Sequence, residues 1–337
     1  MQPTKLLKQI EGIRDSRVIA FLTSDQQNSP FVGRMATDVI PFFYEHLRNV
    51  GRTEKLDLFI YSQGGDTIVP WRFVTLAREH CNQLAVLVTY KAHSAATMLA
   101  LGANEIIMGE MGELSPIDPS IGTPFNPRRE DQPQAQPIEI SVEDVAGFFN
   151  FAKDRLNITS EDNLIQALGM LIEKLHPLAL GSVYRSHALI RLIARKMLSL
   201  HMQEPTDDPL IAQIVDNLAE KLYYHNYVIG RQEAKSLGLK IVNPPEELEE
   251  MLWDLYMAYQ SEMGLGEPFD PSQYISDETE IDRPVAILDS VGLRSCCRKR
   301  LQIKTRKTEQ AEQTEISFRE QVIPWKSEKV DILEGKK

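Results

Sequence analysis

Two short segments constrain this chain most, because each lies where a strand-like apolar run gives way to a helix-like run. The first, residues 60–66, contains the glycine pair Gly64 and Gly65, and the second, residues 91–97, contains Ser94. The carboxyl ends of parallel strands meet at one edge of an open sheet, and ligand sites in such folds lie there. We therefore expect a glycine turn to lie beside a serine at the start of a helix.

These residue types suit acyl transfer. Ser94 would be the nucleophile, and the backbone amides of Gly65 and Ala95 would hold the oxyanion. Glycine at the turn lets the backbone approach a ligand closely, because no Cβ intervenes. Each segment alone also has a plainer interpretation, as a turn or as a helix N-cap. Their occurrence together favours the acyl-transfer interpretation.

The two segments resemble loops of the Clp protease/crotonase superfold, and within it those of signal peptide peptidase A and the serine dehydrogenase proteinase family. Residues 61–65 are similar to the loop that supplies an oxyanion amide there, and residues 92–96 are similar to the nucleophile motif. A looser resemblance continues through residues 112–122 and 229–242. The resemblance implies a parallel-sheet α/β core, a peptide or protein substrate, a homo-oligomer, and neither metal nor organic cofactor.

The Clp pattern does not supply the general base, because residues 117–119 read Ile-Asp-Pro where that pattern has its histidine. Signal peptide peptidases use a serine–lysine dyad instead, and their resemblance implies Lys153 as the base. Lys153 lies on the edge of the apolar stripe of a predicted helix, where burial would favour a neutral amine. A solvated lysine paired with Asp154 is an equal alternative. His225 is the alternative base, since an imidazole is the more usual activator of serine. A partly buried structural histidine among tyrosines is the favoured interpretation of His225.

Composition excludes some classes of protein. A net charge of −11 over 337 residues argues against a general nucleic-acid binder. Three cysteines, two of them adjacent, give no disulfide framework and favour a cytoplasmic protein. No signal peptide and no apolar run long enough to span a bilayer is evident, so no integral membrane segment is expected. Peripheral membrane contact through a partner or a surface helix stays open.

The order of the predicted elements indicates an α/β fold with a parallel sheet core and a mainly helical C-terminal part. The resemblance implies that this core is Clp/crotonase-like. Four regions are expected: the α/β core with both loops (1–122), a mobile proline-rich insert (123–140), a helical part that completes the fold (141–262), and a polar, poorly ordered tail (263–337). The expected strands are residues 17–22, 56–61, 84–89 and 105–108. The expected helices of the core are residues 35–50, 67–80 and 94–101.

Serine peptidase chemistry through a Ser94–Lys153 dyad is therefore the predicted function. Two other classes stay open. A catalytically silent oligomeric scaffold or partner-binding protein would explain the absent histidine. An acyl-CoA enzyme of the crotonase branch would use two oxyanion amides without a serine nucleophile, and the setting of Ser94 argues against it.

Overall fold

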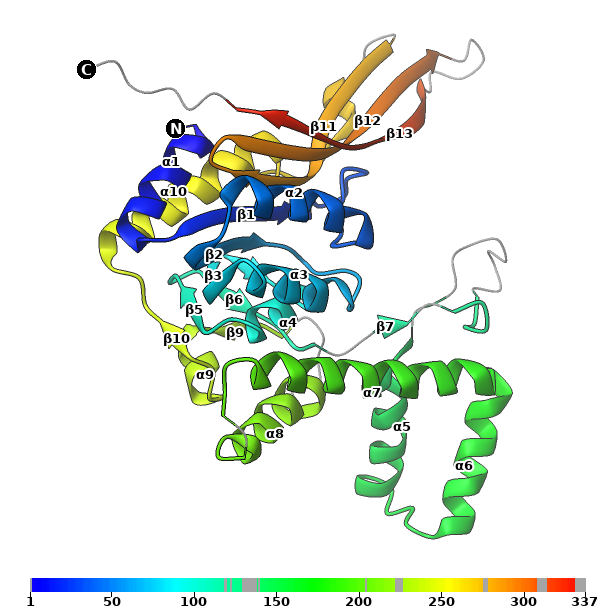
Figure 1. Ribbon diagram of the computed structural model, residues 1–337. Helices are drawn as coiled ribbons and strands as arrows, with labels where there is room; N and C mark the ends of the chain where they lie inside the picture. The colour runs from blue at the N-terminus through cyan, green and yellow to red at the C-terminus, as the bar shows by residue number, and fades with distance from the viewer. Residues whose placement is uncertain are drawn as a thin grey trace, which may run out of the picture. The chain divides into compact units, whose positions relative to one another are not determined.

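The computed structural model describes residues 2–117, 120–121, 123–128, 138, 140–203, 205–221, 227–274, 278–307 and 314–330. The chain divides into two compact units, shown in Figure 1. Unit 1 comprises Met1–Leu114 and Gly230–Lys337, and unit 2 comprises Ser115–Ile229. The chain thus leaves unit 1 at Leu114, earlier than the boundary expected at residue 122. Residues 129–137 and 139 of the expected insert lie outside the described residues.

The elements of unit 1 alternate between strand and helix through the first hundred residues. The strands are β1 (Arg17–Thr23), β2 (Thr53–Tyr61), β3 (Cys81–Val88), β4 (Lys91–Ala92), β5 (Glu105–Met108), β6 (Glu113–Leu114), β10 (Ile241–Val242), β11 (Glu278–Ser290), β12 (Leu293–Lys307) and β13 (Thr314–Lys329). The helices are α1 (Pro3–Arg14), α2 (Ile40–Val50), α3 (Val69–Arg78), α4 (Ala95–Leu101), α9 (Arg231–Ser236) and α10 (Glu246–Met263), with 3-10 turns η1 (Thr37–Val39) and η3 (Pro271–Tyr274). All four strands expected from the sequence occur, with β2 and β3 beginning three residues earlier.

One sheet organises this unit, with strand order β10-β5-β3-β2-β1-β11-β12-β13. The first five strands are parallel, and β11, β12 and β13 extend the sheet by antiparallel pairing from β1 outward. The α/β fold with a parallel core is therefore confirmed. Outside this sheet, β4 pairs in parallel with β6. The carboxyl ends of β2 and β3 lead into the two segments that carry Gly64 and Ser94.

The parallel strands are apolar on both faces because helices cover both. Along β1, Val18 and Leu22 belong to a buried cluster with residues of α1 and α10, two helices that lie side by side in Figure 1. Phe21 points to the opposite face of β1, because side chains alternate along a strand, and its ring centroid lies 5.3 Å from the ring centroid of Phe73 of α3. Phe73 in turn stacks on Phe43 of α2 at 4.0 Å. A strand buried on both faces reads as a continuous apolar run, which is why these strands were predictable.

The expected poorly ordered tail at residues 263–337 is wrong for the described residues, which form β11, β12 and β13. Residues 285–288 of β11 are buried next to β1. The charges that suggested a solvated tail pair across strands: Arg298 lies 2.5 Å and Arg300 3.2 Å from carboxylate oxygens of Asp282. Arg298 and Arg300 are two residues apart and therefore lie on one face of β12, where opposite charges on neighbouring strands stabilise the pairing.

The helix expected at residues 35–50 begins only at Ile40, because Met35 pairs with the glycine turn instead. The Met35 amide donates to the Gly64 carbonyl at 2.9 Å, and the Asp66 amide donates to the Met35 carbonyl at 2.7 Å. Both backbone groups of Met35 are thus engaged with a segment far away in the sequence. The pattern of apolar residues within 35–50 does not indicate a pairing with a distant segment, so the sequence placed the start of the helix too early.

Unit 2 is mainly helical. Its elements are β7 (Ser120–Ile121), β8 (Ile140–Ser141), α5 (Val142–Asp154), α6 (Glu161–Lys174), α7 (Pro177–Ser199), α8 (Asp208–Asp216) and the π-helix η2 (Asn217–Lys221); β9 (Ile229–Gly230) lies where the chain re-enters unit 1. Helix α6 buries no residue although it is amphipathic. Among the helices that the structure describes, none combines the length and apolar character needed to cross a membrane.

Candidate active site

Ser94 lies at a sharp turn between β4 and α4. Its backbone has φ 51° and ψ −114°, a conformation that L-residues rarely adopt. Such a conformation costs on the order of 1–3 kcal/mol and is concentrated at functional sites. Ser94 occupies the N-cap position, but its side chain makes no capping hydrogen bond to the described first turn of α4. A strained strand–turn–helix elbow that presents a half-exposed serine suits a nucleophile better than a cap.

The glycine pair adopts backbone conformations that favour glycine. Gly64 has φ 99° and Gly65 has φ 151°. A Cβ atom at Gly64 would lie 2.9 Å from the Ala95 nitrogen, the His93 oxygen and the Ser94 Cβ. A Cβ at Gly65 would overlap the backbone of Met35. The glycine turn therefore packs directly against the Ser94 turn, as the sequence predicted, and only glycine allows this approach.

Backbone hydrogen bonds hold the two turns in register. The Ser62 amide donates to the Lys91 carbonyl and the His93 amide donates to the Ser62 carbonyl, each at 2.9 Å. The Gly64 amide donates to the Ser62 hydroxyl oxygen at 3.0 Å. The Gly64 amide is therefore engaged within its own turn. The Gly65 and Ala95 amides take part in none of these bonds, and their role as the oxyanion donors stays a prediction.

A half-buried carboxylate, Asp25, ties these strand ends together. It accepts hydrogen bonds from Tyr61 (2.7 Å), Gln63 (3.0 Å) and the Lys91 ammonium (2.7 Å). Burial acts to raise the pKa of Asp25, but the bonds from Gln63, Lys91 and Tyr61 outweigh it and leave the pKa lowered. Asp25 therefore stays ionised and holds both segments that carry the site. Sequence reasoning missed it, since Asp25 sits in an irregular loop with no motif around it.

Lys91 is a second charged group near the serine, and it is held as an ammonium. Burial acts to lower its pKa, while the hydrogen bond and charge of Asp25 raise it, and the net effect is a raised pKa. The Lys91 ammonium also lies 5.0 Å from the centre of the Tyr90 ring. A lysine stabilised in its charged form is unsuited to accept a proton from a serine.

His93, the residue before the serine, points its ring at two other side chains. One ring nitrogen lies 3.1 Å from the Gln63 side-chain oxygen and the other lies 3.2 Å from a Glu113 carboxylate oxygen. Burial raises the pKa of Glu113. Gln63 thus contacts both His93 and Asp25, and joins the histidine to the carboxylate that anchors the glycine loop.

Of the two candidate bases, only Lys153 lies among the described residues. Lys153 lies in the last turn of α5, in unit 2, and its side chain is exposed. The predicted apolar stripe beside Lys153 comprises Val145, Phe149, Ala152 and Leu156; Ala152 is buried, Val145 and Phe149 are half-buried, and Leu156 is exposed. His225, the alternative base, lies outside the described residues.

Comparison with known proteins finds a family resemblance in the first part of the chain. Residues 1–128 match the family of ClpP-like SDH-type serine proteinases. The matched residues include the glycine turn, the Ser94 elbow and Asp25. The resemblance to this family is therefore confirmed over that part, and it supports serine-peptidase chemistry.

The matches over longer stretches have low sequence identity. An uncharacterized protein of Methanocaldococcus jannaschii, MJ0137, is 23% identical over 261 residues, 75% of this chain and 77% of its own length. The 1510-N membrane-bound stomatin-specific protease is 14% identical with a TM-score of 0.36, covering 65% of this chain and 80% of its own. ClpP1 from Listeria monocytogenes is 12% identical with a TM-score of 0.36, and the match covers 72% of this chain and 97% of ClpP1.

Proposed function

We propose that this chain is a serine peptidase that cleaves peptide bonds with Ser94 as nucleophile. The observation that carries the proposal is the contact between the strained Ser94 turn and the Gly64–Gly65 turn. The match of residues 1–128 to a serine proteinase family supports the same chemistry.

In the proposed reaction, the Ser94 Oγ attacks the peptide carbonyl while its proton passes to a general base. The carbonyl oxygen becomes an oxyanion, held by the Gly65 and Ala95 amides. Collapse of this intermediate breaks the C–N bond, and the base returns the proton to the leaving amine. Water then hydrolyses the acyl ester on Ser94 by the same path, releasing the second product. No metal or organic cofactor takes part.

Lys153 is the proposed general base, with His225 as the alternative. A serine–lysine dyad needs a neutral amine, and Lys91, the lysine nearest to Ser94 in sequence, is held as a cation by Asp25. That argument favours a base from another part of the chain. The resemblance to signal peptide peptidases points to Lys153 for this role.

The proposed enzyme acts on peptides or proteins as a cytoplasmic homo-oligomer. Helix α6 supports self-assembly, since Ile165, Leu168 and Ile172 follow one another at helical spacing on one side and are all exposed. Exposed apolar side chains that form a stripe mark a surface that another chain covers. A second copy of this chain is the proposed partner there.

Labelling with a fluorophosphonate tests the proposal directly, because this reagent phosphonylates activated serines. The purified full chain would be labelled, with the modified residue identified by intact mass and peptide mapping. Ser94→Ala and Lys153→Ala would be compared with the control Lys174→Ala, which removes an exposed lysine from the last turn of α6. We expect Ser94 to be labelled, and the rate to fall about 10²-fold or more in Lys153→Ala but not in the control.

The outcomes separate the parts of the proposal. Labelling at Ser94 that persists at full rate in Lys153→Ala would remove Lys153 and leave His225 as the base to test. A folded, assembled protein that is not labelled at Ser94 would refute the peptidase and favour the scaffold.

A further inference from the structure

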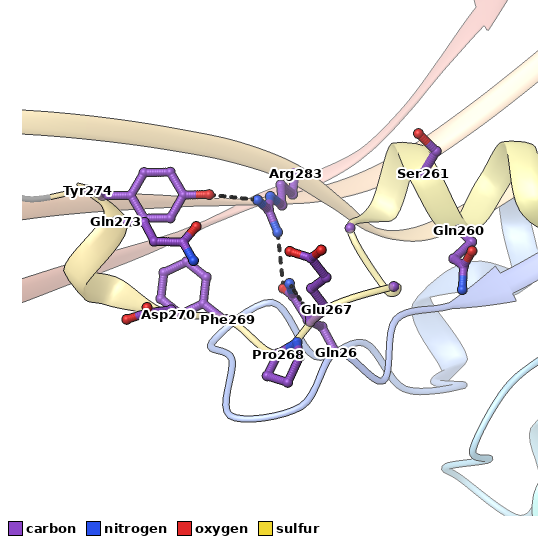
Figure 2. Close-up of a pocket in the computed structure, with 12 residues that line it drawn as sticks. Gln26, Gln260, Ser261, Glu267, Pro268, Phe269, Asp270, Gln273, Tyr274 and Arg283 are labelled. Carbon is purple, nitrogen blue, oxygen red and sulfur yellow. Dashed lines mark hydrogen bonds between the residues drawn. The ribbon is translucent and has the colours of Figure 1, made fainter.

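A polar pocket lies in unit 1, separate from the serine site. It has a volume of about 340 Å³ and is formed by the end of α10, the loop after it, η3 and β11. Figure 2 shows the guanidinium of Arg283 between the side chains of Tyr274 and Gln26. A hollow of this size holds a small molecule. The arginine is its strongest recognition group.

Among the described residues, the groups that hold Arg283 in place are neutral. Its Nη1 donates to the Gln26 side-chain oxygen at 3.2 Å and its Nη2 donates to the Tyr274 hydroxyl at 3.0 Å. The guanidinium lies 5.5 Å from the centre of the Phe31 ring. Among the described residues, no carboxylate comes within ion-pair distance of it. A guanidinium has five N–H donors in a planar fork, so donors remain for a planar anion such as a carboxylate.

The supporting side chains are themselves fixed, so the arginine is pre-positioned. Gln26 is 4% exposed. Its oxygen also accepts from the Ser29 hydroxyl at 2.8 Å, and its nitrogen donates to the Glu267 carbonyl at 3.1 Å. Gly264, with φ 69°, leaves the space that the guanidinium fills, since a Cβ there would overlap Arg283 Nη1. Pre-positioned donors cost less entropy on binding than mobile ones.

The rim of the pocket carries the opposite charge. The exposed carboxylates of Glu267 and Asp270 line it, together with the last turn of α10 at Gln260. The C-terminal end of a helix has a partial negative charge and favours cations. Such a rim repels a multiply charged anion and attracts an ammonium group beside the carboxylate. The pocket is therefore complementary to a zwitterion.

We propose that this pocket binds a free α-amino acid, with its carboxylate on Arg283 and its ammonium group toward Glu267 and the end of α10. The inference does not depend on the peptidase proposal, since no residue of the serine site lines the pocket. The side chain of the ligand would lie in the remaining space beside Phe269 and Tyr274, whose rings stack at 5.7 Å.

Isothermal titration calorimetry on the full chain tests this proposal. The probes are L-alanine, L-leucine and L-phenylalanine, with acetate as a carboxylate lacking the ammonium and inorganic phosphate as a multiply charged anion. We expect saturable binding of at least one amino acid, weaker binding of acetate, and none of phosphate. Arg283→Gln should weaken the binding of the amino acid by about ten-fold or more, since a charge-assisted hydrogen bond is lost. Arg319→Gln, an exposed arginine of β13, should leave binding unchanged.

A second variant keeps the test decisive if Arg283→Gln fails to fold. Glu267→Gln changes an exposed rim residue. It should weaken the binding of the amino acid while leaving the affinity for acetate unchanged or higher. Absence of binding by all three amino acids at millimolar concentration would overturn the proposal. So would phosphate binding as tightly as the amino acids, or affinity unchanged in Glu267→Gln or in folded Arg283→Gln.

Discussion

Replacing Gly64 by alanine should disable the serine site through backbone geometry alone. The new Cβ would lie 2.9 Å from three atoms of the Ser94 turn, closer than Cβ contacts in proteins come. Two of those atoms, the His93 oxygen and the Ala95 nitrogen, belong to the backbone, so the turn itself must move. The φ of 99° adds about 1–3 kcal/mol of strain for an L-residue. A misplacement of reacting groups by about 1 Å costs roughly 10²-fold in rate.

The assay is the rate of fluorophosphonate labelling at Ser94, measured beside the melting temperature. We expect Gly64→Ala to label about 10²-fold more slowly while still folding, with a melting temperature lowered by several degrees. Gly12→Ala is the matched control, because Gly12 lies inside α1 with no atom within 4 Å of the new Cβ. That control should label at the wild-type rate and be slightly more stable. A Gly64→Ala protein that labels as fast as the control would refute the proposed packing of the two turns.

Three further predictions concern the anchor, the assembly and the core. Asp25→Asn should slow labelling at least several-fold. The pKa of Asp25 is lowered from 3.8 in the folded protein, so the ionised carboxylate stabilises the fold above that pH and this stabilisation is lost on acidification. In acid titrations of unfolding, the difference in stability between wild type and variant should therefore narrow below about pH 4. A gap independent of pH would contradict the ionised anchor. Ile165→Glu should reduce the amount of oligomer measured by light scattering, whereas Gln166→Glu, which adds the same charge on α6, should not. An equal amount of oligomer in the two variants would exclude the apolar face of α6 as the assembly surface. Phe73→Ala should cost about 3–5 kcal/mol in denaturant unfolding, because Phe73 is buried between Phe21 and Phe43; a loss under 1 kcal/mol would contradict the packing.

The parallel core and the contact of its two loops were predictable because their signals are local. Each strand ends in a buried, mostly apolar run, and each site segment follows the end of such a strand. The topology of an α/β sheet then brings those ends together. The positions of Gly64 and Ser94 could thus be inferred without any knowledge of side-chain contacts.

What the sequence did not reveal depends on partners far away along the chain. Asp25 acts through Gln63 and Lys91, and no spacing pattern links these three residues. The strands of the C-terminal segment were hidden because the segment is polar, whereas its charges pair across strands, as Arg298 and Arg300 do with Asp282. Arg283 gave no signal either, since its pocket is assembled from segments more than two hundred residues apart.

The most direct test of the central claim is a crystal structure of the protein after reaction with a fluorophosphonate. We predict a covalent bond between the Ser94 Oγ and phosphorus, with the phosphonyl oxygen within hydrogen-bond distance of both the Gly65 and the Ala95 amide nitrogens. An adduct on another residue, or one at Ser94 whose phosphonyl oxygen faces away from both amides, would contradict the proposed site.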